Sequence, residues 1–264
     1  MTHQGTALIT GASSGIGAIY ADRLARRGYD LILVARSRER LNDLAGRISD
    51  DTGRQVEVFV ADLNDRPSLA TVEAKLREDA SITLLVNNAG IGTHKKLVDS
   101  DVEQMTRMID LNVNAPTRLT YAAVPGFITR GKGAIINISS IVSFAPEVLN
   151  GVYGGSKAFV TAFSQSLHHE LADKGLQIQA VVPGATKTKF WSNGGLPVEH
   201  LDPSIVMLAT DLVDAALMDF DNSVLISIPS LQNLEPWEAF EKARQTLASQ
   251  VSNNTSAPRY HGSR

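Results

Sequence analysis

Short apolar runs alternate with longer amphipathic stretches along nearly the whole chain. This alternation predicts repeated βαβ units, which build a parallel sheet covered by helices on both faces. The apolar runs are nearly continuous, as expected for strands that are buried on both sides. We therefore predict one doubly wound α/β domain with about seven strands, at residues 6–10, 31–35, 56–61, 83–87, 134–139, 178–182 and 224–228.

Helix start and stop signals agree with this arrangement. Gly28 follows the first amphipathic stretch, and Asp202 with Pro203 stands where the seventh begins. We expect a single domain over residues 1–251 and a polar, flexible tail over 252–264. The predicted helices cover residues 15–27, 37–49, 66–79, 101–112, 115–130, 152–174, 204–220 and 236–250.

Composition excludes several functional classes. The 264-residue chain has no cysteine, which rules out disulfides and thiolate catalysis, and its net charge of −3 offers no basic field for nucleic acid. The N-terminus lacks the features of a signal peptide, and no apolar run reaches membrane-spanning length. His94, His168 and His169 have no metal-ligand arrangement. We expect a cytoplasmic protein with no metal site, no nucleic-acid partner and no membrane partner.

A glycine-rich turn, TGASSGIG at residues 10–17, follows the first predicted strand and precedes a helix. Glycines here let the backbone approach a ligand closely, and the helix N-terminus offers free N–H groups to a pyrophosphate. The spacing differs from the usual GxGxxG. The turn predicts a dinucleotide site, and the alternative is a tight turn with no ligand.

The end of the second predicted strand bears on the choice between the two nicotinamide dinucleotides. An acidic residue there would bind the ribose hydroxyls, whereas this chain has Ala35 and Arg36. A guanidinium suits a phosphate, so we expect NADP(H) in preference to NAD(H), unless Arg36 is a solvated loop residue. Asp62, after the third strand, is expected to bind the adenine amino group; alternatively it caps a helix, a role for which Asp65 is better placed.

A second group of polar residues follows the fourth and fifth predicted strands. The fourth strand runs into NNAG at 87–90, and the fifth ends at Ser139 and Ser140. Tyr153 and Lys157 stand four positions apart, so they face the same way on a helix. A nearby ammonium lowers the pKa of a phenol and prepares it for proton transfer. Such a pair also occurs by chance in many helices.

Taken in order, these motifs resemble those of the classical short-chain dehydrogenases/reductases, over roughly residues 6 to 190. Each motif alone is weak, but the ordered set is highly specific. The matching segments are TGASSGIG at 10–17, NNAG at 87–90, the asparagine of DLNVNAP, NISS at 137–140, YGGSK at 153–157 and VPGATKT at 182–188.

The resemblance implies a Rossmann domain and a catalytic tetrad. Tyr153 would exchange a proton with the substrate oxygen, and Lys157 would lower the pKa of the tyrosine and hold the nicotinamide ribose. Ser140 would orient the carbonyl or hydroxyl group, and Asn112 would hold a water linked to the lysine. The residues expected to contact the dinucleotide are Gly11, Ser13, Ser14, Gly15, Ile16, Gly17, Arg36, Asp62, Leu63, Asn88, Tyr153, Lys157, Pro183, Gly184 and Thr188.

The neighbours of the tetrad are expected to have structural roles. Ser139 is expected to support its strand and Asn114 to cap the next helix. The resemblance also implies a homodimer or homotetramer built through helix faces. Family members usually end soon after the last strand, whereas this chain continues into a helix with Trp237, which we expect to be a packing residue. That extension leaves the oligomer contacts open.

The substrate loop is expected near residues 189–203, a stretch rich in turn residues. In the family this region closes over the substrate, as a mobile lid would. Phe190 and Trp191 of this loop, with Phe144, Val148 and Leu149, suggest an apolar pocket. Alternatively, Phe190 and Trp191 pack on the sheet.

The expected function is hydride transfer between NADP(H) and a small-molecule carbonyl or secondary alcohol. One alternative is a reductase of carrier-bound 3-oxoacyl groups, which a basic patch at the site entrance would favour. Another is a dinucleotide-binding regulator without catalysis, which would be expected to have lost Tyr153 or Lys157; this chain has both. Sequence alone does not choose the substrate.

Overall fold

The computed structural model describes residues 3–261 and divides into two compact units, Met1–Ser230 and Leu231–Arg264. The second unit contains helix α9 (Glu235–Ala248) and a short 3₁₀ turn at Pro258–Tyr260. The predicted domain boundary at 251 lies within this second unit, and it stays a prediction. Of the tail predicted over 252–264, residues 262–264 lie outside the described part of the chain.

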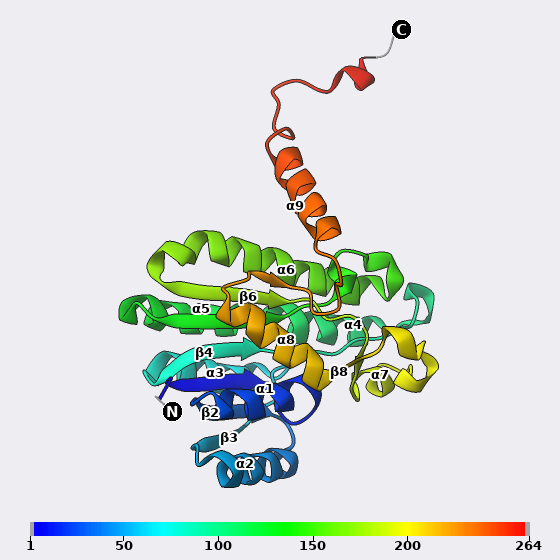
Figure 1. Cartoon of the computed structure of the whole chain (residues 1–264). Helices are drawn as coiled ribbons and strands as arrows, with labels where there is room; N and C mark the ends of the chain where they lie inside the picture. Colours follow the sequence, from blue (N-terminus) through cyan, green and yellow to red (C-terminus); the bar gives the residue numbers. More distant parts are fainter. Residues whose placement is uncertain (1–2, 262–264) are drawn as a thin grey trace. The chain divides into compact units, whose positions relative to one another are not determined.

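The first unit is built on a seven-stranded parallel sheet in the order β3-β2-β1-β4-β5-β6-β9, which confirms the predicted fold class (Figure 1). Strand order reverses at the β1–β4 pair, and open α/β sheets bind ligands at such a switch point, outside the carboxyl ends of the strands. The strands are β1 (Thr6–Thr10), β2 (Asp30–Ala35), β3 (Val56–Val60), β4 (Ile82–Asn87), β5 (Gly133–Ile138), β6 (Leu176–Val181) and β9 (Ile226–Ser227).

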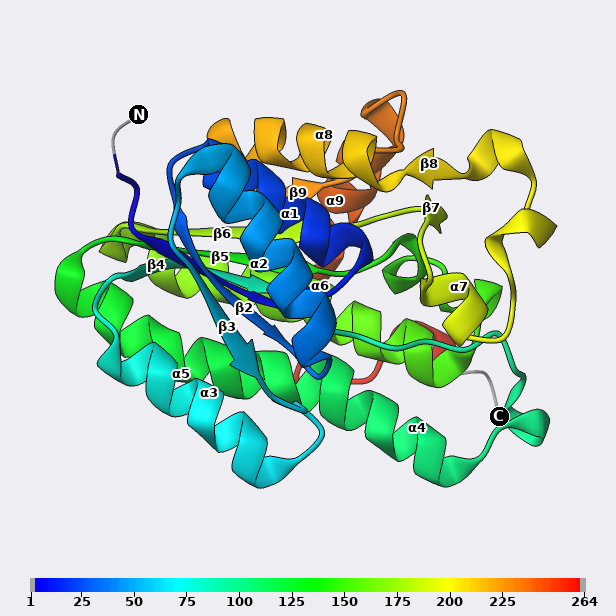
Figure 2. The ribbon, with the colours of Figure 1, turned by 90° about the horizontal axis from the view of Figure 1, so that it is seen from below.

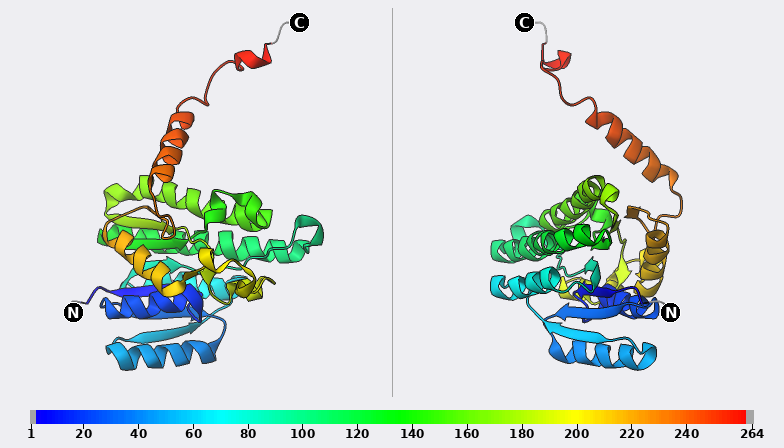
Figure 3. Two further views of the ribbon diagram at one scale, coloured as in Figure 1. Left: turned by 45° about the vertical axis from the view of Figure 1, so that its right-hand side comes forward. Right: turned by 90° about the vertical axis from the view of Figure 1, so that its left-hand side faces the viewer.

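Helices cover both faces of this sheet (Figure 2). One buried cluster joins the sheet to α1 (Gly15–Arg26), α2 (Arg38–Thr52) and α8 (Ala209–Asp221) through residues such as Leu24, Leu41 and Leu212. The other cluster joins it to three more helices, through residues such as Leu76 and Phe127. Strand β3 and helix α2 lie at one edge of the sheet (Figure 3). The second set of helices is α3 (Arg66–Glu78), α5 (Ala115–Arg130) and α6 (Gly151–Leu171).

The predicted start of the seventh helix is wrong. Asp202 instead caps a 3₁₀ turn at Pro203–Ile205, where its side chain accepts a bond from the Ser204 N–H. Met207–Leu208 then forms strand β8, which pairs with β7 (Thr186–Lys187). Because residues 207–208 are used in this pairing, the helix itself, α8, begins only at Ala209.

The prediction that Asn114 caps a helix is also wrong. Helix α4 (Val102–Ile109) continues through a π-helical turn, Asp110–Asn114, directly into α5. Asn114 has helical backbone angles, and its side chain donates to Asp110 Oδ1 at 2.7 Å.

In the described part of the chain, no helix is both long enough and apolar enough to cross a membrane.

Packing of the sheet on α5 gives a stability prediction. A Cβ added at buried Gly133 would lie 2.2 Å from Phe127 Cγ, so Gly133→Ala overpacks the core and lowers the free energy of unfolding by about 1–3 kcal/mol. Gly46 in α2 is exposed and has nothing within 4 Å of the same position, so Gly46→Ala raises that free energy by about 0.5–1 kcal/mol. Urea unfolding measures both; equal stability of the two variants would contradict this packing.

Candidate active site

The glycine-rich turn after β1 has a backbone that only glycine accommodates. Gly11 and Gly15 have φ of +66° and +56°. A Cβ at Gly11 would lie 2.8 Å from Asn88 Nδ2, and one at Gly17 would lie 2.6 Å from the Gly11 carbonyl oxygen. The turn is thus packed tightly against the segment after β4. A bare backbone of this kind fits a dinucleotide phosphate, which must come close to the chain.

Asn88 holds this turn in place. Its side-chain amide donates to the carbonyl oxygens of Thr10 at 2.8 Å and Gly11 at 3.2 Å. In return, Thr10 Oγ1 accepts bonds from the N–H groups of Asn88 and Ala89, both at 3.0 Å. Asn88 therefore supports the nucleotide turn from behind, and direct contact of its side chain with the dinucleotide stays a prediction.

The N-terminus of helix α1 is open towards a ligand. Ser14 is the N-cap residue in extended conformation, is exposed, and its side chain makes no capping hydrogen bond. Ser13 and Ile16 beside it are half-buried. Free N–H groups at a helix N-terminus, together with the helix dipole, form a binding site for a pyrophosphate. The residues present thus fit the cofactor that the sequence predicts.

The residues predicted to bind the adenosine side of the cofactor lie at the ends of the paired strands β2 and β3. Arg36 follows β2, is exposed, and has no hydrogen bond or ion pair among residues 3–261. Asp62 follows β3 and is half-buried; its Oδ1 accepts the Asn64 N–H at 3.0 Å, and Leu63 next to it is buried. Asp65 caps α3, as its position suggested.

Tyr153 and Lys157 lie on the first turns of α6, and both side chains are buried, with exposures of 5% and 6%. The lysine Nζ donates to the Ile138 carbonyl at the end of β5, at 2.9 Å, and lies 5.9 Å from the centroid of the tyrosine ring. Burial lowers the pKa of Lys157 to about 8, because desolvation disfavours its charged form.

The pKa of Tyr153 departs from its ordinary value in the direction opposite to the one expected. Burial raises the pKa of the phenol to about 12, and the hydrogen bond with the Ser140 side chain offsets only part of this rise. Lys157 does not lower the pKa of the phenol here, because a lysine with a pKa of about 8 is already neutral at the pH where the phenol titrates. The phenol is therefore held in its protonated form.

The two serines after β5 have different roles. The Ser139 hydroxyl donates to the Lys157 carbonyl at 2.8 Å and lies 2.7 Å from Thr161 Oγ1, so it joins the strand to α6. Ser140 is the residue whose side chain bonds Tyr153. Its Oγ lies 3.5 Å from the Pro183 carbonyl oxygen, which also accepts the Ile141 N–H at 2.9 Å.

Asn112 lies in the π-helical turn between α4 and α5, a local irregularity that often marks functional sites. Its amide donates to the Ile91 carbonyl at 2.9 Å and to Ser156 Oγ at 3.0 Å, and its Oδ1 accepts the Ile91 N–H at 3.0 Å. Both side-chain polar atoms are therefore bonded within the protein. The predicted contact of Asn112 with a water stays a prediction.

The segment after β6 brings the predicted nicotinamide-side residues towards the nucleotide turn. Thr188 Cγ2 lies 3.4 Å from where a Cβ of Gly15 would be. Gly184 lies close to Ser230: a Cβ at Gly184 would lie 3.2 Å from Ser230 Oγ. Residues 10–17 and 183–188, far apart in sequence, thus meet at Gly15 and Thr188.

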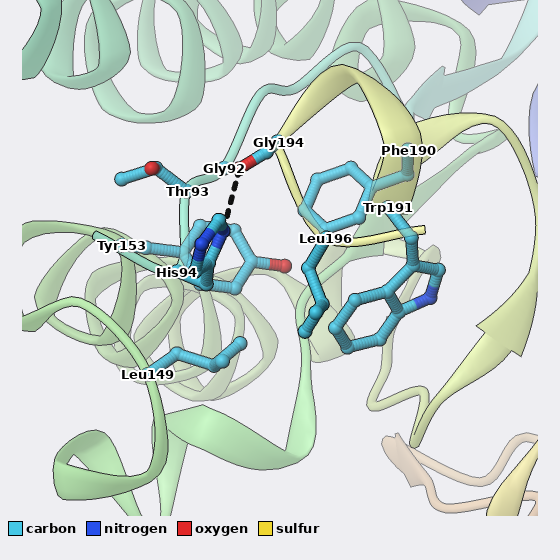
Figure 4. A pocket seen from close by; sticks show the side chains of 9 residues that line it. All are labelled: Gly92, Thr93, His94, Leu149, Tyr153, Phe190, Trp191, Gly194 and Leu196. Carbon is cyan, nitrogen blue, oxygen red and sulfur yellow. Dashed lines mark hydrogen bonds between the residues drawn. The ribbon is translucent and has the colours of Figure 1, made fainter. Parts of the chain in front are cut away.

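An apolar pocket opens beside Tyr153 (Figure 4). Phe190 packs on the tyrosine with ring centroids 5.5 Å apart, and Trp191 meets Phe190 edge-on at 5.9 Å. As it stands, the pocket holds about one water molecule. Phe144 and Val148, which we also expected here, do not line it. The lining is Gly92, Thr93, His94, Leu149, Tyr153, Phe190, Trp191, Gly194 and Leu196.

Sequence reasoning missed the wall formed by Gly92, Thr93 and His94. A Cβ at Gly92 would lie 2.4 Å from Phe190 Cζ, so the tip of the ring packs against bare backbone. His94 Nδ1 is 2.9 Å from the Gly194 carbonyl oxygen, which links the wall to the predicted substrate loop (Figure 4). The only signal for this wall in the sequence was Gly92, two positions after NNAG. Nothing in the sequence indicated His94, because its partner, the Gly194 carbonyl, is 100 residues away.

Comparison with known proteins agrees with this geometry. A family model described as short chain dehydrogenase matches residues 5–195. Among solved structures, a short-chain dehydrogenase from Sphingobium yanoikuyae in complex with NADPH is 48% identical, with a TM-score of 0.94 over 97% of this chain and 99% of that one. A bulky-bulky ketone specific alcohol dehydrogenase from Comamonas testosteroni is 45% identical, with a TM-score of 0.91 over 99% of this chain and 100% of that one.

A very-long-chain 3-oxoacyl-CoA reductase from Anas platyrhynchos is 38% identical over 188 residues. That match covers 70% of this chain and 60% of the duck protein, so the chain spans less than two thirds of that relative. The family match, by contrast, includes the nucleotide turn, the serines, Tyr153 and Lys157. The chain therefore belongs to the short-chain dehydrogenase/reductase family.

Proposed function

We propose that the protein transfers a hydride between NADP(H) and a carbonyl or secondary alcohol, with Tyr153 as the general acid and base. The observation that carries this proposal is the position of a protonated, buried phenol. Tyr153 forms part of the lining of an apolar pocket, with the Ser140 hydroxyl as its hydrogen-bond partner and Lys157 beneath its ring. A non-catalytic regulator would have no use for this arrangement.

The bound nicotinamide supplies the hydride, and the protein supplies the proton. Negative charge develops on the carbonyl oxygen during reduction, and the Tyr153 hydroxyl donates its proton to that oxygen. Ser140 donates a hydrogen bond that orients the same oxygen and stabilises its charge. Lys157 holds the ribose and, in its charged form, stabilises the phenolate that remains. Lys157 then gives a proton back to the phenolate, and a water held by Asn112 would replace that proton on the lysine from solvent.

Several observations support NADP(H) in particular. Arg36 is exposed, is free of protein partners in the described residues, and follows β2 where no carboxylate stands. The Sphingobium relative is described in complex with NADPH. The dinucleotide contacts proposed for this chain are those that the sequence predicts, from Gly11 to Thr188. A homodimer or homotetramer and a cytoplasmic location complete the proposal.

A ketone with bulky apolar groups is the substrate class that the pocket favours. Four apolar side chains line the pocket: Leu149, Phe190, Trp191 and Leu196. The Comamonas relative is described as specific for bulky-bulky ketones. Because the pocket holds about one water molecule, Phe190 has to move before such a ketone reaches Tyr153.

Long-chain 3-oxoacyl thioesters are a second candidate, favoured by the likeness to the duck reductase. Four exposed lysines adjoin the pocket residues in sequence, two after His94 and two around Thr188. They could bind the phosphates of an acyl carrier. The four are Lys95, Lys96, Lys187 and Lys189.

Replacement of Arg36 tests the cofactor. Arg36→Ala is expected to raise the Kd for NADPH about tenfold or more and to leave the Kd for NADH within about twofold, because a charge-assisted phosphate bond is lost. Arg47→Ala removes an equally exposed charge of α2 and is expected to change neither value. Fluorescence titration measures both; tighter or equal binding of NADH by the unmodified protein would overturn the preference.

Replacement of Tyr153 tests the chemistry. NADPH oxidation is followed across small ketones, diaryl ketones, quinones and 3-oxoacyl thioesters, with the highest kcat/KM expected for the bulky ketones. Tyr153→Phe is expected to lower kcat by about 1000-fold, since it removes the proton, while the Kd for NADPH stays within about threefold. Retained turnover by the variant, or no turnover of any carbonyl by the unmodified protein, would refute the proposal.

The pKa of Lys157 gives a pH prediction. The lysine is charged below about pH 8 and neutral above it, whereas the phenol stays protonated up to about pH 12. The kcat/KM for reduction should therefore fall about tenfold per pH unit above pH 8. Lys157→Met is expected to have a kcat/KM about 100-fold lower, with no fall above pH 8. A flat profile of the unmodified protein up to pH 10 would contradict the assignment.

A further inference from the structure

The pocket wall Gly92–His94 belongs to a long connection, residues 88–101, between β4 and α4. A short 3₁₀ turn at Leu97–Asp99 is the regular structure that this connection contains. A loop of this length does not fix its own backbone. A wall that faces a reacting carbonyl therefore needs anchors at both of its ends.

The upstream anchor is Asn112, which bonds both backbone polar groups of Ile91, directly before the wall. The same side chain donates to Ser156 Oγ, and the Ser156 hydroxyl in turn donates to the Tyr153 carbonyl at 2.8 Å. The upstream end of the wall is thus connected to helix α6, one turn from the reacting phenol.

The downstream anchor is Asn150, whose side chain is buried, with an exposure of 5%. Its amide donates to the Lys95 carbonyl at 2.7 Å and to Ser100 Oγ at 3.2 Å. Its Oδ1 caps α6 by accepting the N–H groups of Val152 at 2.9 Å and Tyr153 at 3.4 Å. One side chain therefore joins the residue directly after the wall to the backbone of the proton donor.

We propose that Asn150 is a positioning residue that holds the wall Gly92–His94 at a set distance from Tyr153, and so maintains the pocket that binds the ketone beside the phenol. The inference rests on the proposed function. Helix capping alone does not explain the residue, because serine or aspartate caps a helix equally well. An asparagine has both an acceptor for the helix and two donors for the loop, and each is used here.

The substitution Asn150→Asp separates the two roles. An aspartate keeps the oxygen that caps α6, and it loses the amide donors and repels the Lys95 carbonyl. The helix and Tyr153 stay in place while the wall is released. Asp65→Ala is the matched control, since it removes a helix cap on α3 that accepts the Ser68 N–H at 3.0 Å and has no link to the wall.

Two readouts test the proposal in the full chain. Hydrogen exchange of the backbone amides of residues 92–96 is expected to quicken about tenfold in Asn150→Asp and to stay unchanged in Asp65→Ala. For the best ketone of the panel, the variant's KM should rise about tenfold, with kcat within about threefold and the Kd for NADPH unchanged. Ser100→Ala removes one partner of the Asn150 amide and also the bonds from the Ser100 hydroxyl to the Lys95 and Lys96 carbonyls, so it is expected to quicken exchange in the same residues.

The proposal is overturned if Asn150→Asp has the same amide exchange rates at residues 92–96 and the same KM for the ketone as the unmodified protein. It is also overturned if kcat, KM and the Kd for NADPH all worsen together, because a general loss of structure would cause that. If Asn150→Asp does not fold, Asn150→Ser, which also keeps a capping oxygen and loses the amide donors, decides between the same outcomes. Hydrogen exchange needs no substrate. An absence of carbonyl turnover in the unmodified protein would therefore refute the proposed function, and the exchange rates would still decide whether Asn150 holds the wall.

Discussion

Two reciprocal hydrogen bonds join helix α6 to the end of strand β5, and the candidate site depends on them. The Lys157 ammonium donates to the Ile138 carbonyl, and the Ser139 hydroxyl donates to the Lys157 carbonyl. These bonds place the first turns of α6, and with them Tyr153, directly over the carboxyl end of the sheet. The same burial that makes the contact lowers the pKa of the lysine and raises that of the phenol.

Further along the same helix, a buried amide network continues this attachment. Asn87 and Asn137 are paired across β4 and β5, and the Asn87 amide donates to Asn137 Oδ1 at 2.9 Å. Asn137 then donates to Ser164 Oγ on α6, also at 2.9 Å. Polar groups in such a core are costly unless they are bonded, so they favour one register between helix and sheet over others. The position of Tyr153 is therefore set by bonds along about two turns of α6.

Close backbone contacts complete the site where side chains would not fit. The nucleotide turn touches the segment after β4 at Gly11 and Gly17, and the pocket wall touches Phe190 at Gly92. Both contacts join elements from distant parts of the chain, and the reversal of strand order between β1 and β4 brings them to one edge. The fold thus places the candidate cofactor site and the candidate substrate pocket side by side, because parallel strands end there.

The sequence alone determined the seven strands, the nucleotide turn and the ordered residues Ser140, Tyr153 and Lys157, because hydrophobic periodicity and local motifs are properties of neighbouring residues. Tertiary structure decided what depends on partners far away in the chain. The pairing of β8 with β7 moved the start of α8 to Ala209. Burial reversed the expected shift in the pKa of Tyr153. The contacts of the pocket wall with Asn150 exist only because residues 92–100 lie beside the start of α6 in the folded chain.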